Sequence, residues 1–380
     1  MRDQAPQSGI VFDVVPLHSK APMHDLPDSQ RHAFLQQMPK AELHLHLDGS
    51  ARAETLIEIA RAEGRAIPTH DPVELARLLH PGPGVSTLRD YLRAFDITVP
   101  LMQSEEAIER IAHELIEDCA MENHLYVEVR YAPVFLTAGG LTMEQAVRAV
   151  GRGLDRASTA FGVRTRQILC AMRHLPSSEG EAVVDLAARI GDDVGVGAVD
   201  LAGAEAEFPA ELHRSTFDRA RAAGVPRTVH AGEAAGSESV RVALTTLHAQ
   251  RLGHGTALRE DAALREAVRE EGVVVEVCPT SNVQTGAVPS IEDHPAAAFL
   301  REGLRVAVCT DNRTVSATTL AREFDLLIRS HRLRLDEVRQ LTANAFEGAF
   351  LPDAEREALV SRALAAFDDL VAACGLSSSR

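Results

Sequence analysis

The chain has 380 residues, of which 45% are hydrophobic, and a formal net charge of -16. Because nucleic-acid binding needs clustered Lys and Arg to displace counterions, this acidic balance argues against a nucleic-acid partner. A small neutral or cationic substrate fits it better, although the solubility of an abundant cytosolic protein is enough to explain the charge. No run approaches the ~20 apolar residues of a membrane span, so no membrane partner is expected.

The first 35 residues carry Pro, Gln, Asp and Ser instead of the basic start and apolar core of a secretory signal. We expect residues 1–35 to form a partly disordered N-terminal extension of a cytoplasmic protein. The five cysteines are an odd number, widely spaced and without a CxxC pair, so they are not a disulfide framework.

Eight apolar strand-like runs follow, separated by Ala-, Leu- and Arg-rich stretches that are typical of helices. The runs are 41–47, 125–131, 166–172, 195–201, 227–230, 250–254, 273–278 and 305–311. Strands that alternate with helices form parallel sheets with right-handed crossovers, and eight such units predict an α/β fold, a closed (β/α)8 TIM barrel. We expect a single catalytic domain over 36–374, with a helical insertion after strand 1, extra C-terminal helices and a frayed tail over 375–380.

Polar residues with metal-binding chemistry occur almost only where these runs end, which is where barrels of this kind carry their catalytic groups. His44 and His46 lie two apart in the first run, so both imidazoles project to one face, the barrel interior. His230, His254 and Asp311 end the fifth, sixth and eighth runs. The imidazoles of His44, His46 and His230 and the carboxylate of Asp311 are a set of ligands that zinc accepts. A catalytic zinc site keeps a further position for a water molecule, which would ionise near neutral pH.

The groups available for proton transfer and the scarcity of lysine refine the prediction of this site. Glu233 follows His230 in a Gly-containing turn and is available as a proton shuttle, while His254 is available as a base or an orienting group. Many two-metal barrel hydrolases bridge their ions with a carboxylated lysine from a middle strand, but the only lysines are Lys20 and Lys40. We therefore expect one zinc ion per chain.

Six segments, in this order, resemble the adenosine deaminase family of the amidohydrolase barrels. They are PKAELHLHLDGS (39–50), VDLAGAE (199–205), HAGE (230–233), RLGHG (251–255), VCPTSNVQTGAV (277–288) and CTDN (309–312). The resemblance covers about residues 35–350 and implies the zinc ligands His44, His46, His230 and Asp311. It also implies that Glu233 protonates N1 of the purine, which makes C6 electrophilic. His254 would orient and deprotonate the metal-bound water, with Asp311 assisting.

The resemblance further implies that a purine nucleoside is the small-molecule partner. Substrate contacts are expected from His46, Asp48, Gly203 and Asn312. Gly203 would offer its backbone amide to N3, a role that suits glycine because the ligand must approach the main chain closely. Asp48 matches the residue that contacts the ribose 5'-hydroxyl. Asn312 departs from the family, where most members have a second aspartate, but its amide donates to the N7 acceptor without holding an added proton.

The reaction implied is the zinc-dependent hydrolysis of adenosine and 2'-deoxyadenosine to inosine and 2'-deoxyinosine, with release of ammonia. Adenine and aminodeoxyfutalosine deaminases share the catalytic residues and stay as alternatives. Asp48 in HLHLDG favours a nucleoside, since relatives that act on the free base or on modified nucleosides more often resemble HLHLEG. A nucleoside-binding barrel without catalysis is disfavoured by the complete set of catalytic residues.

The HxE and PCxxC motifs of nucleic-acid deaminases do not occur. The sequence does not indicate an oligomeric state.

Some residues allow two interpretations. Glu128 and Glu276 lie within strand runs and either support metal ligands from behind or form structural ion pairs. The stretch 87–97, which follows a PGPG loop at 81–84, has apolar residues at helical spacing and forms either a core-facing stripe or, as in the family, a lid over the ribose. Four histidines without a partner pattern are expected at the surface or at helix ends: His174, His213, His248 and His294.

Overall fold

The computed structural model describes residues 23–82 and 87–376. Eight strands run parallel and pair in chain order as two four-stranded sheets, β1 to β4 and β5 to β8. They are β1 (Lys40–His46), β2 (His124–Tyr131), β3 (Arg164–Met172), β4 (Val196–Ala202), β5 (Thr228–Ala231), β6 (Arg251–His254), β7 (Val274–Val277) and β8 (Arg305–Val308). Each strand overlaps one predicted run, with ends that differ by at most three residues; β8 ends at Val308, three residues before the predicted end at Asp311.

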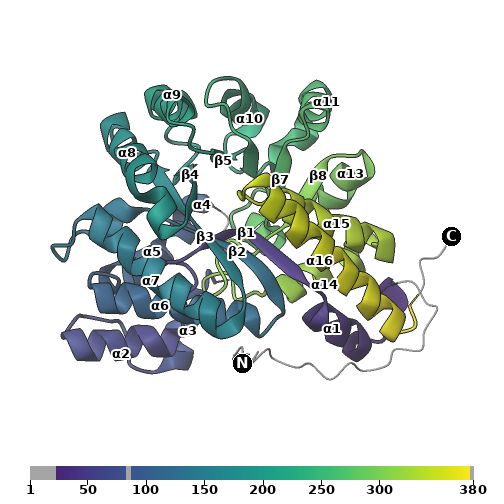
Figure 1. Ribbon diagram of the computed structural model, residues 1–380, viewed down its shortest axis with the longest axis horizontal. Helices are drawn as coiled ribbons and strands as arrows, with labels where there is room; N and C mark the ends of the chain where they lie inside the picture. Colours follow the sequence, from purple (N-terminus) through teal and green to yellow (C-terminus); the bar gives the residue numbers. More distant parts are fainter. Residues whose placement is uncertain (1–22, 83–86, 377–380) are drawn as a thin grey trace, which may run out of the picture.

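Two bridges join the sheets into a closed barrel (Figure 1). Val199 of β4 pairs in parallel with Arg227 before β5, and Leu45 of β1 pairs with Asp311 just beyond β8. The predicted (β/α)8 barrel is confirmed. The closure has a direct consequence for the site, because it places Asp311 beside the end of β1.

Strand β2 shows why these runs are so apolar and yet carry charges. Its residues Val127 and Val129 are fully buried and pack outward against apolar side chains of α6 (Glu105–Ala120) and α7 (Met143–Phe161). Each such burial stabilises the fold by roughly 1.5–3 kcal/mol. The alternate residues Glu128 and Arg130 project into the barrel, as the two-residue period requires.

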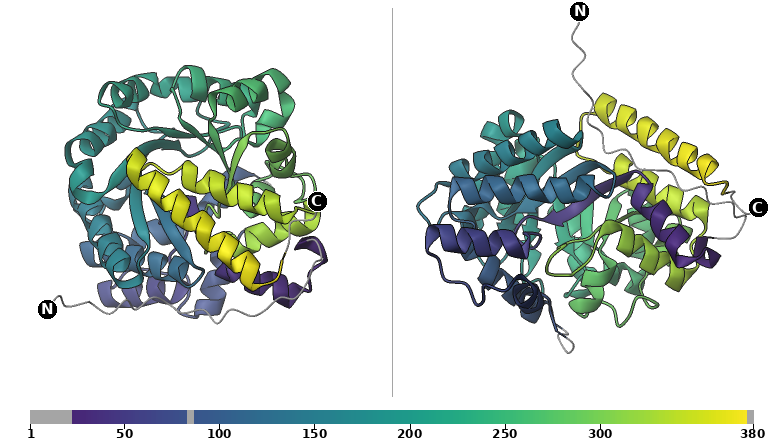
Figure 2. Two further views of the ribbon diagram at one scale, coloured as in Figure 1. Left: turned by 45° about the vertical axis from the view of Figure 1, so that its right-hand side comes forward. Right: turned by 90° about the horizontal axis from the view of Figure 1, so that it is seen from below.

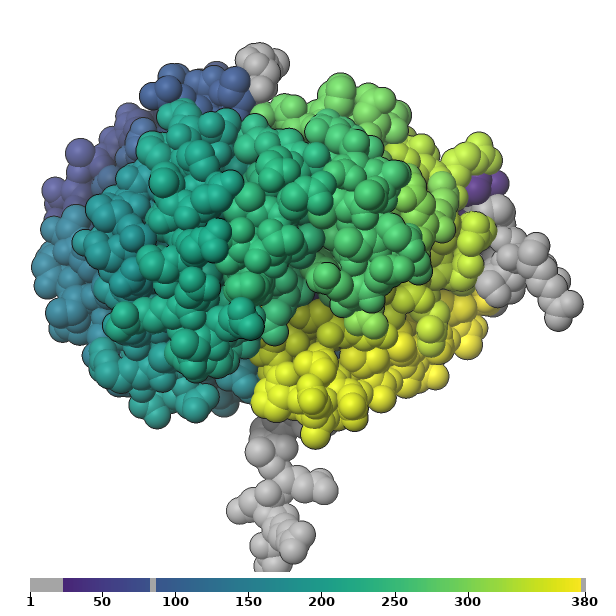
Figure 3. Space-filling view, turned by 90° about the horizontal axis from the view of Figure 1, so that it is seen from above, coloured from purple at the N-terminus to yellow at the C-terminus, as the bar shows by residue number. Residues whose placement is uncertain are grey.

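The helices form an outer layer in sequence order around the barrel (Figure 1). On the face seen from above, the surface colours follow the chain from blue through teal and green to yellow (Figure 3). After α6 and α7 come α8 (Ser177–Val194), α9 (Arg214–Ala222), α10 (Gly236–Thr245), α11 (Ala262–Glu271), α12 (Pro279–Gln284), α13 (Ala296–Arg301), α14 (Leu320–His331), α15 (Leu335–Glu347) and α16 (Asp353–Ala373). Helices α14 to α16 follow β8, as predicted. Among the described residues, no helix combines the length and the apolar character needed to span a membrane.

The predicted insertion between β1 and α6 is also present. It contains α2 (Ala53–Glu63), α3 (Pro72–Leu79), α4 (Leu88–Tyr91) and α5 (Phe95–Thr98). A 3₁₀ turn over Leu92–Ala94 separates α4 from α5, so the stretch 87–97 is not the single continuous helix that its spacing suggests. Of the PGPG loop, residues 83 and 84 lie outside the described part of the chain.

The packed part of the chain starts upstream of residue 36. A 3₁₀ turn over Met23–Asp25 is followed by helix α1 (Asp28–Gln37), which lies beside α14 and α16 (Figures 1 and 2). Phe34 is fully buried and meets Phe367 of α16 edge-to-face, with ring centroids 5.7 Å apart. The expected boundary after residue 35 therefore falls inside a packed helix. The remainder of the expected extension, residues 1–22, and tail residues 377–380 lie outside the described residues.

Candidate active site

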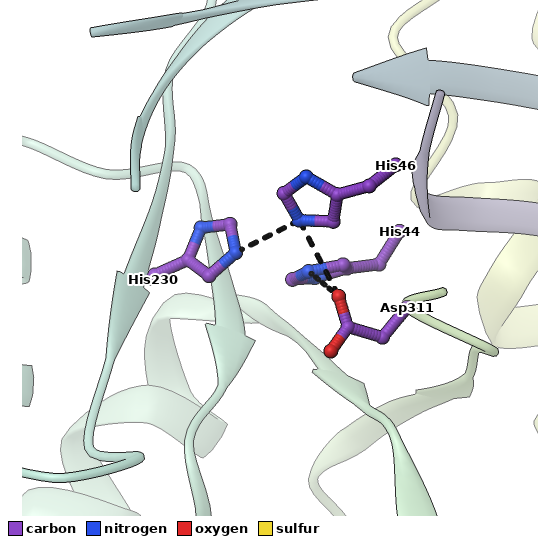
Figure 4. A group of neighbouring side chains, drawn as sticks. All are labelled: His44, His46, His230 and Asp311. Atoms are coloured by element: carbon purple, nitrogen blue, oxygen red, sulfur yellow. Dashed lines mark hydrogen bonds and ion pairs between the residues drawn. The ribbon is translucent and has the colours of Figure 1, made fainter. Parts of the chain in front are cut away.

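Four of the predicted residues converge at the C-terminal ends of the strands (Figure 4). The ligand atoms of His44, His46, His230 and Asp311 all lie within 4.8 Å of one another. The Nε2 atom of His46 is 3.3 Å from Nε2 of His230 and 3.3 Å from Oδ1 of Asp311. The Nε2 atom of His44 is 3.4 Å from the same carboxylate oxygen. The barrel thus brings together residues from β1, β5 and the end of β8.

The donor chemistry of this group fits a metal ion. The Nε2 atom of His44 is buried without a hydrogen-bond partner, while its Nδ1 lies 3.0 Å from the Glu276 carboxylate. A proton on Nδ1 satisfies that contact, so Nε2 presents a lone pair toward Asp311 and the other imidazoles. A buried polar atom without a partner is costly, and coordination removes that cost. Three imidazole nitrogens and one carboxylate oxygen are a set that zinc accepts.

Three of these four side chains, those of His44, His230 and Asp311, are held from behind by a second polar group. Glu276 contacts His44 as described, Oδ2 of Asp200 is 2.9 Å from Nδ1 of His230, and the Ser281 hydroxyl donates to Oδ2 of Asp311 at 2.6 Å. Such contacts fix ring orientation and ligand basicity. Glu276 fits both interpretations, because it contacts His44 and also forms ion pairs with Arg130 and Arg251.

Arg130 joins two of these supporting groups. Its Nη1 atom lies 2.9 Å from Asp200 and its Nη2 atom 2.8 Å from Glu276, and all three side chains are fully buried. Glu276 also contacts Nε of Arg251 at 2.6 Å. Glu128 pairs with Arg251 and accepts a hydrogen bond from the Tyr126 hydroxyl, so it has the structural ion-pair role. A charged network, not an apolar plug, fills the barrel under the ligand group.

The backbone at Asp311 and His254 adopts the left-handed region, with φ of 62° and 63°. Non-glycine residues pay roughly 1–2 kcal/mol for this conformation. The fold holds Asp311 there through two main-chain hydrogen bonds: its N–H donates to the carbonyl of His44 at 2.9 Å, and its carbonyl accepts from His46 N–H at 2.7 Å. Strain of this kind is common where a structure fixes functional side chains.

A cavity of about 700 Å³ opens above the ligand group. It is lined by all the predicted site residues except His44, namely His46, Asp48, Gly203, His230, Glu233, His254, Asp311 and Asn312. Leu88, Tyr91, Leu92 and Phe95 of the insertion also line it, and Tyr91 additionally packs with Val315 in a small apolar cluster. Stretch 87–97 is therefore both a wall of the cavity and part of the core. A largely apolar cavity with a few convergent polar groups is typical of a small-molecule site.

Glu233 is buried on the wall of this cavity, 3.6 Å from His254 measured between Oε2 and Nε2. Burial raises the pKa of Glu233 well above its ordinary value, and the negative charges of Asp311 and Glu205 raise it further. The protonated form of its carboxyl group is therefore favoured over the carboxylate. Glu205 accepts hydrogen bonds from the N–H groups of Gly232, Glu233 and Ala234 at 2.6, 2.9 and 2.5 Å, which fixes the HAGE turn.

The expected substrate residues have distinct local reasons for their positions. Gly203 has φ of 105°, which a side chain would strain. A Cβ on Gly49 would fall 1.7 Å from Oδ1 of Asn312, so only glycine leaves room for that amide beside the cavity. Asp48 is buried, with Oδ1 unpartnered within the described residues, and burial raises its pKa to about 7.

Four histidines were expected at the surface or at helix ends. His213 lies at a helix end, directly before α9, but it is buried, and its Nε2 lies 3.0 Å from the carbonyl of Arg173. His294 is also buried, with Nε2 3.1 Å from Oδ1 of Asn282. A surface position was wrong for both because their partners come from other parts of the chain. His174 is exposed, as expected, but it stacks on Phe135 at the cavity.

The sequence assigned no role to several residues that support the site: Arg130, Asp200, Glu205, Ser281, Asn282 and His294. Most of them stand inside the segments VDLAGAE and VCPTSN, at or just after strand ends. Their position near strand ends was the feature of the sequence that could have indicated a role in the site. A buried carboxylate next to a strand end has to be paired, and the predicted histidine ligands needed partners.

A closed (β/α)8 barrel with three histidines and an aspartate at its C-terminal end defines a metal-dependent hydrolase of the amidohydrolase kind. Comparison with known proteins narrows this class. The family model "Adenosine deaminase" matches residues 39–366. The adenosine deaminase of Enterococcus faecalis is 40% identical over 325 residues, 86% of this chain and 96% of that protein. The adenosine deaminase of Clostridium kluyveri is 38% identical over 318 residues, 83% and 91% of the two chains. The chain belongs to the adenosine deaminase family.

Solved structures agree on the fold. The adenine deaminase from Arthrobacter aurescens superposes with a TM-score of 0.81 at 26% identity, covering 87% of this chain and 99% of that one. The N6-methyl-AMP deaminase from Arabidopsis thaliana gives 0.76 at 27% identity, covering 89% and 98%. By name, the first of these proteins is a deaminase of adenine and the second a deaminase of N6-methyl-AMP.

Proposed function

We propose that this chain hydrolyses adenosine and 2'-deoxyadenosine to inosine and 2'-deoxyinosine, releasing ammonia, with one zinc ion bound by His44, His46, His230 and Asp311. One observation carries the proposal: a buried Glu233, whose pKa is raised well above its ordinary value, shares a cavity of about 700 Å³ with this group of three histidines and an aspartate. The adenosine deaminases that are 36–40% identical over most of the chain support the same substrate class.

Around the purine, each of these side chains has a separate role in the reaction. Zinc supplies, when bound, a Lewis acid that lowers the pKa of water toward neutrality. Glu233 holds the proton that N1 must receive before C6 accepts an oxygen nucleophile, and a carboxyl group with a raised pKa suits this task. His254 faces the same space, 3.6 Å from Glu233. The amine leaves C6 as ammonia, and the carbonyl of a 6-oxopurine takes its place.

Binding of the substrate is assigned to residues that line the cavity and have free polar atoms. Gly203 offers its backbone N–H to N3, Asn312 its side-chain amide to N7, and Asp48 its carboxyl to the ribose 5'-hydroxyl. His46 also lines the cavity, and its Nδ1 atom lies 4.0 Å from Oδ1 of Asp48. Asp48 favours a nucleoside over free adenine, because the base alone has no group for that carboxyl to bind.

The test is a parallel assay of adenosine, 2'-deoxyadenosine, adenine and a 5'-substituted adenosine, followed by loss of absorbance near the adenosine maximum. Rapid turnover of the first two supports the proposal. Turnover confined to adenine or to the 5'-substituted compound would keep the site and replace the substrate. Absence of turnover on all four, with zinc bound, would refute the function.

A further inference from the structure

A line of polar side chains runs from His254 away from the cavity. The Nδ1 atom of His254 lies 2.9 Å from the amide nitrogen of Asn282, and the amide oxygen of Asn282 lies 3.1 Å from Nε2 of His294. All three side chains are buried. The line ends on the main chain, because the N–H of Ala296 donates to Nδ1 of His294 at 3.2 Å and the N–H of Cys278 donates to Oδ1 of Asn282 at 3.3 Å.

These two main-chain donors fix the direction of every hydrogen bond in the line. A backbone N–H can only donate, so Nδ1 of His294 bears no proton. The ring is neutral, since burial lowers the pKa of His294 to about 3, and its single proton lies on Nε2. Nε2–H then donates to Oδ1 of Asn282. That oxygen accepts from both Cys278 and His294, so the NH₂ of the amide has to face His254.

The amide of Asn282 therefore donates to Nδ1 of His254, and the proton of the neutral His254 ring lies on Nε2. This nitrogen faces the cavity, 3.6 Å from the carboxyl of Glu233. We propose that Asn282 and His294 are positioning residues that lock His254 in the Nε2–H tautomer, so that His254 donates a hydrogen bond to the oxygen nucleophile.

This role differs from the one expected from the sequence. A ring nitrogen that already carries a proton has no lone pair with which to take a second, so Nε2 of neutral His254 orients and stabilises the nucleophile without deprotonating it. Nε2 keeps its hydrogen throughout. The identity of the nucleophile rests on the proposed function, whereas the tautomer rests only on the hydrogen bonds.

The tautomer can be measured directly on the zinc-loaded, full-length chain labelled with ¹⁵N in histidine. Long-range ¹H–¹⁵N correlation distinguishes ring nitrogens that carry a proton from those that do not, and His254→Gln identifies the His254 signals by their loss. We expect protonated Nε2 and unprotonated Nδ1. The reverse pattern would overturn the inference whatever the enzyme turns over.

Asn282→Asp tests the role with a nearly isosteric change. A carboxylate still accepts from Cys278 and His294 but has no hydrogen for His254, so the His254 proton should move to Nδ1. We expect kcat to fall roughly 10²-fold, in the range of single hydrogen-bonding and proton-transfer groups, with a much smaller change in KM. An unchanged tautomer with near-native kcat would refute the proposal.

His294→Gln and His124→Gln complete the design. Glutamine at 294 can still donate an amide hydrogen to Asn282, so it should keep the tautomer and most of kcat. His294→Leu leaves Oδ1 of Asn282 with only the N–H of Cys278, so it should hold the amide less firmly and lower kcat more than His294→Gln does. His124 is an equally buried histidine whose ring, within the described part of the chain, is hydrogen-bonded to the carbonyl of Cys119 alone. Its variant measures the cost of altering a buried imidazole elsewhere. A native chain without deaminase activity would refute the proposed function, while the tautomer measurement stands independently.

Discussion

Arg130 connects metal binding to the stability of the barrel, and its removal should affect both. In Arg130→Met, Asp200 loses its guanidinium partner and Glu276 keeps only Arg251. Although burial raises the pKa of Glu276, the charges of Arg130 and Arg251 hold it below its ordinary value. The variant leaves negative charge buried without full compensation.

The size of the effect follows from this geometry. Removing one partner of a buried ion pair costs about 3–5 kcal/mol of unfolding free energy. Loss of groups that support metal ligands typically lowers metal affinity about 10–100-fold, and Arg130 orients the carboxylates behind both His44 and His230. We expect both losses together, because Asp200 and Glu276 are free to reorient or take up protons.

Urea denaturation and competition for zinc with a chelator of known affinity measure the two effects. Arg31→Met is the matched control, since Arg31 is also buried and pairs with Asp325 and Asp28, both at 2.5 Å, but lies on α1 away from the ligand group. It should lose stability and keep zinc affinity. Arg130→Lys retains the charge but lacks the fork that contacts both carboxylates. Its stability and zinc affinity should therefore lie between those of the native chain and those of Arg130→Met. Equal zinc affinity in Arg130→Met and Arg31→Met would refute the reasoning.

Three further predictions concern single carboxyl groups. Glu233→Gln should keep zinc and lose about 10²–10⁴-fold in kcat, measured with adenosine; comparable turnover would exclude the acid role. Asp311→Ala should lower both zinc content and rate, and one zinc per chain in the variant would show that Asp311 is not a ligand. Burial raises the pKa of Glu323 to about 7. Between about pH 4.5 and 7, Glu323 therefore keeps its proton in the folded chain and releases it in the unfolded chain. The free energy of unfolding falls as the pH rises through that window. Glu323→Gln should remove up to about 3 kcal/mol of this pH dependence, seen as a gain in relative stability at pH 8 over pH 4.5; parallel pH profiles would contradict it.

The sequence was most informative where a local rule decides geometry. The two-residue period of a strand places His44 and His46 on one face, and parallel strands in a barrel bring their C-terminal ends to one side. These two rules were enough to gather His230 and Asp311 with them. The strands were equally clear, because they are buried on both faces and so appear as short apolar runs.

The missing parts depend on contacts between distant segments. Asn282 and His254 are 28 positions apart, and Arg130 and Glu276 are 146 apart. No periodicity connects such pairs, so His294 looked like a surface residue and Arg130 like an ordinary strand residue. Helix α1 was missed for the same reason, since its burial depends on α14 and α16, far along the chain.

The interior charges explain why this site tolerates so many buried polar groups. Within the network described above, three carboxylates, Glu128, Asp200 and Glu276, face two guanidinium groups, Arg130 and Arg251. The Asp311 carboxylate at the ligand group adds further negative charge. A divalent cation bound there would offset this excess, so the same ion that supplies the chemistry also balances the charge of the barrel interior. The metal ligands and the network beneath them are therefore one electrostatic unit, in which each buried charge is acceptable only because the others are present.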